Sequence, residues 1–259
     1  MLVETHGRVS LLITNTPIIH FEKFIMLEEI TNLFEKQGGE FISPPSFIQE
    51  KLKGIKAFIF DWDGVFNSGT KGEGISSTYT EADSMGTNLL RFGYWLGNNQ
   101  ELPIMAIITG ENNQSAKKLA QREHFHHIYF KIANKAIALE HLLSSFNLKN
   151  EEIAFCFDDV LDFPIAEKCG LRFMVKRDAS PLFKQYAIEN NLCDYITSQQ
   201  GGNHAVREIS DLILGLTGQI NQVIKERTAF SELYTNYLTQ RNIPATKMFT
   251  VKNGVVCNV

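Results

Sequence analysis

The sequence predicts an α/β protein with a Rossmann-like, three-layer α/β/α core, in which helices cover both faces of a central parallel sheet. Two observations predict this class. From Ile55 onward, short apolar runs of strand length alternate with helical patterns. Polar residues gather directly after several of these runs, where parallel strands would end. With 259 residues, 44% of them hydrophobic, the chain is long enough for one such domain with extensions.

The first predicted strand covers residues 55–60. The glycine-punctuated stretch 68–80 follows, and its β-branched second half predicts a small β-hairpin. Beyond it the pattern predicts, in order, a helix over 83–96, a strand over 103–108, a helix over 114–123, a strand over 127–130, a helix over 133–145, a strand over 152–157, a helix over 161–169, a strand over 171–175, a helix over 181–190 and a strand over 194–197.

Residues 1–51 are predicted to form a partly helical N-terminal extension, with one helix over 26–36. Met26 is a candidate translation start, which the mass of the natively expressed protein would test. The core domain is assigned to residues 52–212. Residues 213–259 are expected to form a C-terminal helical extension with an irregular end. The helices expected near that end cover 206–226 and 231–240.

Charge and cysteine content exclude several partners. The net charge is -4 and the basic residues form no stripe, so no nucleic-acid partner is expected. No apolar run approaches the roughly 18 residues that span a bilayer, so no membrane partner is expected either. The four cysteines form no CxxC pair, so neither a zinc site nor a disulfide framework is indicated. A reducing, cytoplasmic location fits these features best.

The candidate catalytic and ligand-binding residues follow predicted strands or lie near the start of a predicted helix. They are Asp61 and Asp63 after the first strand, Thr109 and Gly110 after the second, Asp158, Asp159 and Asp162 after the strand over 152–157, and Lys135 near the start of a helix. Because the carboxyl ends of parallel strands meet at one edge of a sheet, these groups are expected to converge.

Such a set suits metal-assisted phosphoryl transfer. Clustered carboxylates repel one another unless a cation neutralises them, and oxygen ligands suit Mg²⁺. A carboxylate can attack phosphorus to form an aspartyl-phosphate, while an amine and a hydroxyl bind the remaining phosphate oxygens. A second carboxyl group two residues further on can give a proton to the leaving alkoxide and later activate water.

Each residue alone has a plainer interpretation. An aspartate after a strand is more often a helix cap than a catalyst, and this applies to Asp159 and Asp162 in particular. Lys135 alone would be a solvated helix lysine. The histidines of segment 124–127 lack the spacing of a helical zinc pair and precede a strand, so they are interpreted as structural. The functional interpretation depends on the combination of residues.

Together and in this order, four segments resemble the motifs of the haloacid dehalogenase (HAD) phosphatase superfamily. The segments are Asp61-Trp62-Asp63-Gly64-Val65, Thr109-Gly110, Lys135 and Asp158-Asp159-Val160-Leu161-Asp162. Only about 45 residues separate the first two, too few for an inserted cap domain. The stretch from 52 to 212 also resembles the cap-less subgroup of 3-deoxy-D-manno-octulosonate 8-phosphate (KDO 8-phosphate) phosphatases, including the late Gly201-Gly202 segment.

The resemblance implies a role for each site residue. Asp61 is the implied nucleophile and a metal ligand, and Asp63 is the implied general acid/base, with its backbone carbonyl also on Mg²⁺. Asp158 is the implied third metal ligand, and Asp159 would contact metal-bound water. The implied phosphate-binding groups are Thr109, Gly110 and Lys135, and Asp162 would support Lys135. Members of the subgroup are typically homotetramers, in which a neighbour's hairpin and tail help to close the site.

The chain departs from the family pattern at several positions. The family usually has glycine at four of them, where this chain has Ser84, Lys131, Phe157 and His204. It usually has arginine where this chain has Glu111, and a smaller aliphatic residue where this chain has Trp62. The acids and the lysine are all present. The expected activity is therefore a Mg²⁺-dependent phosphomonoesterase for a small sugar-acid or sugar phosphate. The alternatives are another substrate, such as a nine-carbon keto-sugar acid phosphate, or a catalytically weak binding or scaffold protein.

Overall fold

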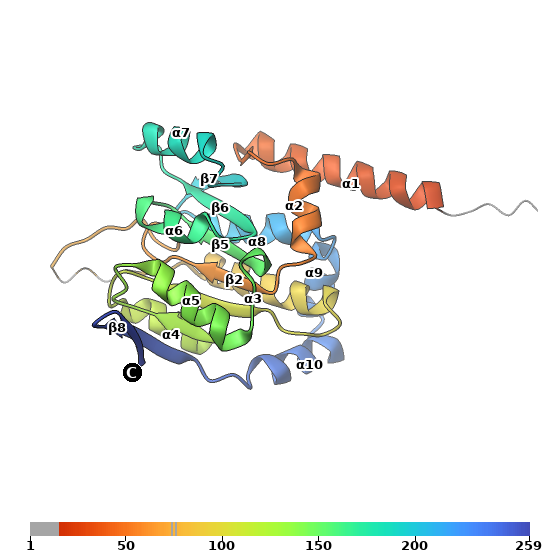
Figure 1. Cartoon of the computed structure of the whole chain (residues 1–259). Helices are drawn as coiled ribbons and strands as arrows, with labels where there is room; N and C mark the ends of the chain where they lie inside the picture. The colour runs from red at the N-terminus through yellow and green to blue at the C-terminus, as the bar shows by residue number, and fades with distance from the viewer. Residues whose placement is uncertain (1–15, 74, 76) are drawn as a thin grey trace, which may run out of the picture.

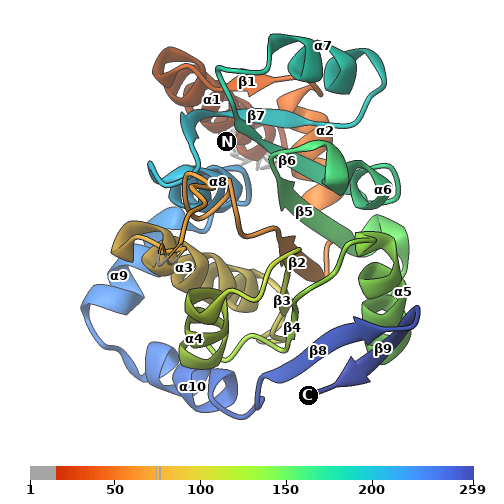
Figure 2. The ribbon, with the colours of Figure 1, turned by 90° about the vertical axis from the view of Figure 1, so that its left-hand side faces the viewer.

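One mixed sheet forms the centre of the molecule. The computed structural model describes residues 16–73, 75 and 77–259 of the chain. The strands of these residues are β1 (Glu40–Phe41), β2 (Ala57–Phe60), β3 (Ile104–Ile108), β4 (His127–Tyr129), β5 (Ile153–Phe157), β6 (Leu171–Lys176), β7 (Tyr195–Gln200), β8 (Lys247–Lys252) and β9 (Val255–Asn258). They pair in the order β1-β7-β6-β5-β2-β3-β4-β8-β9, which Figure 2 shows.

The strands from β7 to β8 in this order run parallel, and only β1 and β9 are antiparallel to their neighbours. The chain passes from β2 to β3 and β4 on one side, then returns to β5, β6 and β7 on the other. The strand order therefore reverses between β2 and β5. Ligands bind at such a switch point, outside the carboxyl ends of the strands. The predicted mostly parallel α/β fold is confirmed.

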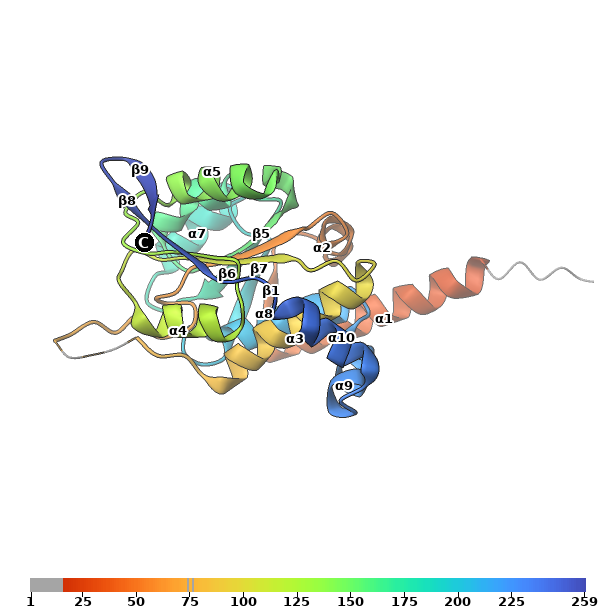
Figure 3. The same cartoon turned by 90° about the horizontal axis from the view of Figure 1, so that it is seen from below.

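Helices cover both faces of the sheet, as Figure 3 shows from below. The helices are α1 (Thr16–Gln37), α2 (Pro45–Leu52), α3 (Glu81–Gly97), α4 (Gln114–Arg122), α5 (Lys135–Phe146), α6 (Phe163–Ala166), α7 (Pro181–Glu189), α8 (Ala205–Leu216), α9 (Ile220–Thr228) and α10 (Glu232–Arg241), with two 3₁₀ turns, η1 (Asn150–Glu152) and η2 (Val160–Asp162). The apolar sides of α2, α3, α4 and α8 pack on one face. Those of α5, α6 and α7 pack on the other.

Helices α3 and α8 pack closely because α3 has glycine at the contact. A Cβ atom on Gly86 would lie 2.9 Å from the Arg207 Cα atom. At the same contact Asp83 Oδ1 accepts a hydrogen bond of 3.0 Å from the Arg207 N–H group, which satisfies a free amide of the first turn of α8. The segment from 83 to 86 is thus part of a helix that positions α8.

A third layer covers the outer side of α3. The predicted helix over 206–226 is interrupted by Gly218, whose φ of +71° is unsuited to a helix, so α8 and α9 are separate. Aromatic residues of α3 and α10 form their own small core there, in which the rings of Phe92 and Tyr237 lie 4.8 Å apart. Among the helices described, none is long and apolar enough to cross a membrane.

The C-terminal end is a hairpin, and the expectation of an irregular end is wrong. Strand β8 pairs with β4 and then with β9. The turn contains Asn253 and Gly254, both with positive φ. This dipeptide between alternating apolar residues is a strong hairpin signal, which the sequence interpretation missed. Segments of both predicted extensions therefore pair with the central sheet, and the boundaries at 52 and 212 stay a prediction.

The predicted hairpin over 68–80 is a different case, and two of its residues, 74 and 76, lie outside the described residues. The described residues of this stretch form no strand. Side-chain contacts, rather than the backbone hydrogen bonds of a β-hairpin, hold this stretch. Lys71 Nζ lies 2.6 Å from Asp63 Oδ2, and Ser77 Oγ donates a hydrogen bond to Asp63 Oδ1 at 2.7 Å. The segment thus extends as a loop beside the carboxyl edge (Figure 1). At the N-terminal end, α1 is longer than the helix predicted over 26–36.

Replacement of Phe249 by alanine tests whether the C-terminal hairpin is part of the core. This ring lies 5.2 Å from that of Tyr129 and 4.6 Å from that of His141, and only 7% of Phe249 is exposed. We expect the free energy of unfolding, measured with urea, to fall by about 3–5 kcal/mol. The control is Val255→Ala on the exposed β9, expected within about 0.5 kcal/mol of wild type. Equal effects of the two changes would contradict the placement of β8 in the core.

Candidate functional site

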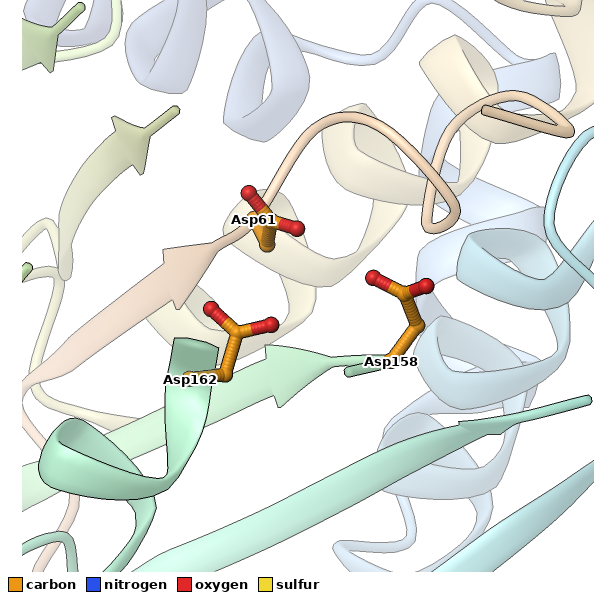
Figure 4. Close-up of side chains that lie close together, drawn as sticks. All are labelled: Asp61, Asp158 and Asp162. Carbon is orange, nitrogen blue, oxygen red and sulfur yellow. The ribbon is translucent and has the colours of Figure 1, made fainter. Parts of the chain in front are cut away.

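Three buried carboxylates meet where β2 and β5 end. Asp61 follows β2, Asp158 follows β5, and Asp162 ends the short turn η2. One carboxylate oxygen of each lies within 4.8 Å of the others. Figure 4 shows the three side chains directed toward the same region. The parallel pairing of β2 with β5 brings Asp61 and Asp158 together, as the sequence predicted.

Lys135 lies between two of these carboxylates. Its Nζ atom is 2.6 Å from Asp61 Oδ1 and 2.6 Å from Asp162 Oδ1. Burial alone would lower the pKa of Lys135, but the two carboxylates raise it above its ordinary value. The ammonium group is therefore retained, and it neutralises part of the acidic cluster. The contact of Asp162 with Lys135 is compatible with the supporting role that the resemblance implies, which stays a prediction.

Asp158 has a different partner. One of its oxygens, Oδ2, is ion-paired with the guanidinium group of Arg177. Its other oxygen, Oδ1, is buried and has no hydrogen-bond partner among the described residues. Burial, and then the nearby Asp61, raises the pKa of Asp158 to about 8. The same two causes raise the pKa of Asp162 to about 7.

Asp63 lies outside this cluster, at the start of the loop that follows β2. Its carboxylate accepts hydrogen bonds from Lys71 at 2.6 Å, Ser77 at 2.7 Å and Asn113 at 3.0 Å. Burial alone would raise the pKa of Asp63, but these hydrogen bonds and the charge of Lys71 outweigh it and hold the pKa below its ordinary value. Asp63 is thus held as an anion beside the cluster.

Thr109 ends β3 at the same edge and is buried. Its Oγ1 atom accepts a hydrogen bond of 3.0 Å from Asn113 Nδ2, so the hydroxyl proton is available to an oxygen in the site. Asn113 therefore connects Thr109 to Asp63. Gly110 follows in the exposed loop, where its backbone is accessible.

Among the predicted site residues, Asp159 has a structural role as the N-terminal cap of η2. Its Oδ1 atom accepts a hydrogen bond of 2.7 Å from the N–H group of Val160, at the first turn of η2. Asp159 is exposed and is not one of the three clustered carboxylates. Its predicted contact with metal-bound water stays a prediction.

The loop after Asp63 approaches the cluster closely because it contains glycine. Gly64 has a φ of +89°, and a Cβ atom there would lie 2.0 Å from Asp158 Oδ2. The Gly201-Gly202 segment packs on this loop within the same chain, since a Cβ atom on Gly201 would lie 2.0 Å from the Gly64 carbonyl oxygen. A cavity of about 510 Å³ opens between the two segments, and its lining includes none of the predicted site residues.

The bulky departures from the family pattern do not enter the cluster. The Phe157 side chain is fully buried in the core under α6, where its ring lies 6.2 Å from that of Phe163. Trp62 is fully buried on the opposite face and stacks on Phe66 at 4.8 Å. Successive residues of an extended segment point to opposite faces, so both aromatic rings are directed away from the neighbouring aspartates.

At two other departures the backbone keeps a conformation that favours glycine. Lys131 has a φ of +57° and His204 a φ of +72°. Such a conformation strains a residue with a Cβ atom by about 1 kcal/mol. The loop after β4 and the residue before α8 thus carry a bulky side chain on left-handed backbone.

The sequence interpretation missed four residues that contact the predicted site: Lys71, Ser77, Asn113 and Arg177. Asn113 carries a usable signal, because it precedes a predicted helix directly after Thr109-Gly110. Arg177 also follows a predicted strand at the carboxyl edge, as the recognised acids do. For Lys71 and Ser77 no periodic pattern exists, because their contacts depend on how the loop folds.

The acidic cluster suits a small, hard cation. In the part of the chain that the structure describes, all three available ligand groups are carboxylates, and Asp158 Oδ1 is a buried oxygen without a hydrogen-bond partner. A divalent cation would satisfy that oxygen and reduce the repulsion among the acids. Asp61 and Asp158 follow the two strands at the switch point and are the candidate ligands there; Lys135 contacts both Asp61 and Asp162.

Comparisons with known structures define the class of protein. A HAD-superfamily subfamily IIIA hydrolase from Legionella pneumophila matches with a TM-score of 0.59 and 28% identity, covering 71% of this chain and 95% of that one. A KDO 8-phosphate phosphatase from Vibrio cholerae matches with a TM-score of 0.56 and 30% identity over 68% of this chain and 92% of that one. The chain is thus a HAD-type phosphatase without a cap domain.

The sequence comparison is more specific. No protein-family model matches the chain. The curated 3-deoxy-D-manno-octulosonate 8-phosphate phosphatase of Escherichia coli is 32% identical over 176 residues, which are 68% of this chain and 87% of that protein. The chain therefore belongs to the KDO 8-phosphate phosphatase family, and the predicted resemblance is confirmed.

The raised pKa values of Asp158 and Asp162 predict that cation binding releases protons. A carboxyl group with a raised pKa is partly protonated near neutral pH, and a cation must displace that proton. We therefore expect affinity for Mg²⁺ to increase as pH rises from about 6 to 8, by up to about tenfold per pH unit. Titration calorimetry in buffers of different ionisation enthalpy measures the protons released.

The control for this titration is Glu140→Gln, which removes an exposed carboxylate of α5 outside the cluster. It should leave both the affinity and the number of released protons unchanged. Binding that is independent of pH, with no proton release, would contradict the raised pKa values.

Proposed function

We propose that this chain is a Mg²⁺-dependent phosphomonoesterase that hydrolyses a small sugar-acid or sugar phosphate through an aspartyl-phosphate on Asp61. The observation that carries this proposal is the position of Asp61. Its buried carboxylate ends β2 at the switch point, 2.6 Å from the Lys135 ammonium group and beside Asp158. Family membership at 32% identity supports the same chemistry.

Asp61 attacks phosphorus, and the bond from phosphorus to the leaving oxygen breaks. The Lys135 ammonium group and the Thr109 hydroxyl, with the amide of Gly110, bind the phosphate oxygens and favour the charge that develops on them. When bound, Mg²⁺ supplies electrostatic neutralisation of the carboxylate–phosphate repulsion; Asp61, Asp158 and the Asp63 carbonyl would hold it. Asp162 supports this arrangement by fixing Lys135 at 2.6 Å.

Asp63 carries the proton. The leaving alkoxide takes a proton from the Asp63 carboxyl group, and Asp63 then accepts one from the water that hydrolyses the aspartyl-phosphate. In the resting protein its pKa lies below the ordinary value, because hydrogen bonds outweigh burial. A bound phosphate adds negative charge beside Asp63 and raises that pKa, which favours the protonated form needed in the first step.

Family membership supports one substrate class. A related phosphatase from Moraxella catarrhalis, 26% identical with a TM-score of 0.56, is described in complex with magnesium ion, phosphate ion and KDO. We propose a phosphorylated keto-sugar acid of this kind for this chain. An eight-carbon substrate is favoured over a nine-carbon one by the curated relatives.

Replacement of Asp61 by asparagine should lower Mg²⁺-dependent hydrolysis of an aryl phosphate by at least about 10³-fold, because the amide is a poor nucleophile. A panel of phosphorylated sugars and sugar acids, assayed for phosphate release with Mg²⁺, then ranks the substrates by kcat/KM. The eight-carbon acid phosphate is expected to rank first.

Asp211→Asn is the matched control, because it removes a carboxylate that pairs with Arg207 on α8 away from the cluster. It should retain full activity. If wild type shows no turnover, or if the Asp61 variant keeps it, the proposed chemistry is wrong. Absence of turnover would instead favour a binding or scaffold role.

We also propose that the chain assembles as a homotetramer, in which the loop over 68–80 contacts a neighbour. The described parts of this loop, 68–73 and 77–80, extend beyond the body of the protein (Figure 3), and Ile75 is 54% exposed. An isolated apolar side chain on a projecting loop gains stability when a partner covers it.

Light scattering coupled to gel filtration measures the assembly. The wild type is expected at the mass of four chains, and Ile75→Asp should shift part of the protein to smaller species. Ile243→Asp, at a position 77% exposed after α10, should not. A monomeric wild type would contradict the proposed assembly.

A further inference from the structure

Arg177 is placed at the acidic cluster by an irregularity in the sheet. It directly follows β6, whose pairing with β7 shifts register between Met174 and Lys176. At the shift the Lys176 N–H group donates to Thr197 Oγ1 at 3.0 Å instead of to a backbone carbonyl. Bulges of this kind re-aim the side chains that follow them. Here the arginine is directed toward the end of β5.

The guanidinium group of Arg177 lies between a buried carboxylate and the loop after Asp63. Its Nε and Nη2 atoms both contact Asp158 Oδ2. On the other side, a Cβ atom on Gly64 would lie 2.3 Å from Nη2, so the group fills the space that this glycine leaves. The carboxylate is 1% exposed and the Arg177 side chain 35%, so the arginine has a path to solvent while the aspartate has none.

Charge balance explains why an arginine is favoured there. Of the three clustered carboxylates, Asp61 and Asp162 share the Lys135 ammonium group. Among the described residues, Arg177 is the cation that contacts the third. A buried carboxylate without a counter-charge would be strongly destabilising. Arg177 thus neutralises the same carboxylate that is proposed as a ligand of the divalent cation.

We propose that Arg177 is a latch that competes with the divalent cation for Asp158. Without the cation, the guanidinium group closes on Asp158 and stabilises the empty site. A cation held by Asp158 would draw on the same single negative charge that pairs with Arg177, so its binding would weaken that ion pair and leave the arginine, whose side chain is 35% exposed, free to turn toward solvent. This inference rests on the metal site of the proposed function. It adds that Arg177 opposes binding of the cation at that site.

Two measurable consequences follow from competition. The apparent dissociation constant of the cation equals the intrinsic constant divided by the fraction of molecules in which the latch is open, so a latch that is mostly closed raises it. The latch also stabilises the metal-free protein more than the metal-bound protein, because the ion pair exists only in the former. A merely structural ion pair would stabilise both states alike.

The test compares Arg177→Gln with Lys176→Gln. Lys176 is the adjacent residue and pairs with Asp178 at 3.3 Å, so its replacement removes one positive charge from the same strand end without touching Asp158. Titration calorimetry with Mg²⁺ alone measures affinity, and thermal unfolding is recorded in chelator and in saturating Mg²⁺.

Arg177→Gln should bind Mg²⁺ about tenfold more tightly than wild type, and Lys176→Gln within about twofold. In chelator Arg177→Gln should unfold at a lower temperature than wild type, and saturating Mg²⁺ should remove that difference. Equal or weaker Mg²⁺ affinity in Arg177→Gln, or a stability loss that persists with Mg²⁺, would overturn the latch.

These measurements use no substrate, so they separate the latch from the proposed reaction. Tighter Mg²⁺ binding in Arg177→Gln supports the latch even if no phosphate ester is hydrolysed. Tighter binding that survives the further change Asp158→Asn would overturn it, because the two groups then do not compete at this carboxylate. An unchanged Mg²⁺ affinity with a raised KM for the phosphate ester would also overturn it and assign Arg177 to the substrate instead.

Discussion

Repulsion among three buried carboxylates is the constraint on which the site depends. Their oxygens lie within 4.8 Å of one another at an edge of the sheet that is largely removed from solvent. Like charges at this distance cannot all persist without nearby cations. The fold supplies Lys135 from the first turn of α5 and Arg177 from the end of β6. Together they face all three acids, since Lys135 contacts Asp61 and Asp162 and Arg177 contacts Asp158.

The reversal of strand order makes this concentration of charge feasible. At the switch point the parallel strands β2 and β5 lie side by side, so the acids that follow them meet at the same edge of the sheet. The aromatic neighbours occupy the cores on either side: Trp62 packs under α3 and α8, and Phe157 under α6. The site is thus a thin polar edge between two apolar cores. Its shape depends on glycine at position 64, where any side chain would overlap Asp158.

The sequence predicts those parts of this arrangement that follow from local residue patterns, and not those that depend on how distant segments fold together. The strands and the convergence of Asp61, Thr109, Lys135 and Asp158 follow from local periodicity and from the geometry common to parallel sheets. The hairpin at Asn253-Gly254 was also predictable from its turn residues. The contacts of Ser77 with Asp63 were not, because side-chain hydrogen bonds rather than a strand ladder hold that loop. Arg177 follows a predicted strand, but its contact with Asp158 depends on a register shift that no periodic pattern reveals.

The departures from the family pattern lie around the cluster rather than in it. Lys131 and His204 keep the left-handed backbone that glycine would adopt more easily, so the loops retain their course at some conformational strain. Phe157 replaces a glycine, yet its side chain extends into the core away from the acids. The acids, Lys135 and Arg177 contact one another, whereas the bulky side chains lie in the cores and the exposed loops lie around the site. Such a division is expected of a cap-less site, in which a few strand ends fix the reaction and exposed loops adjust the specificity.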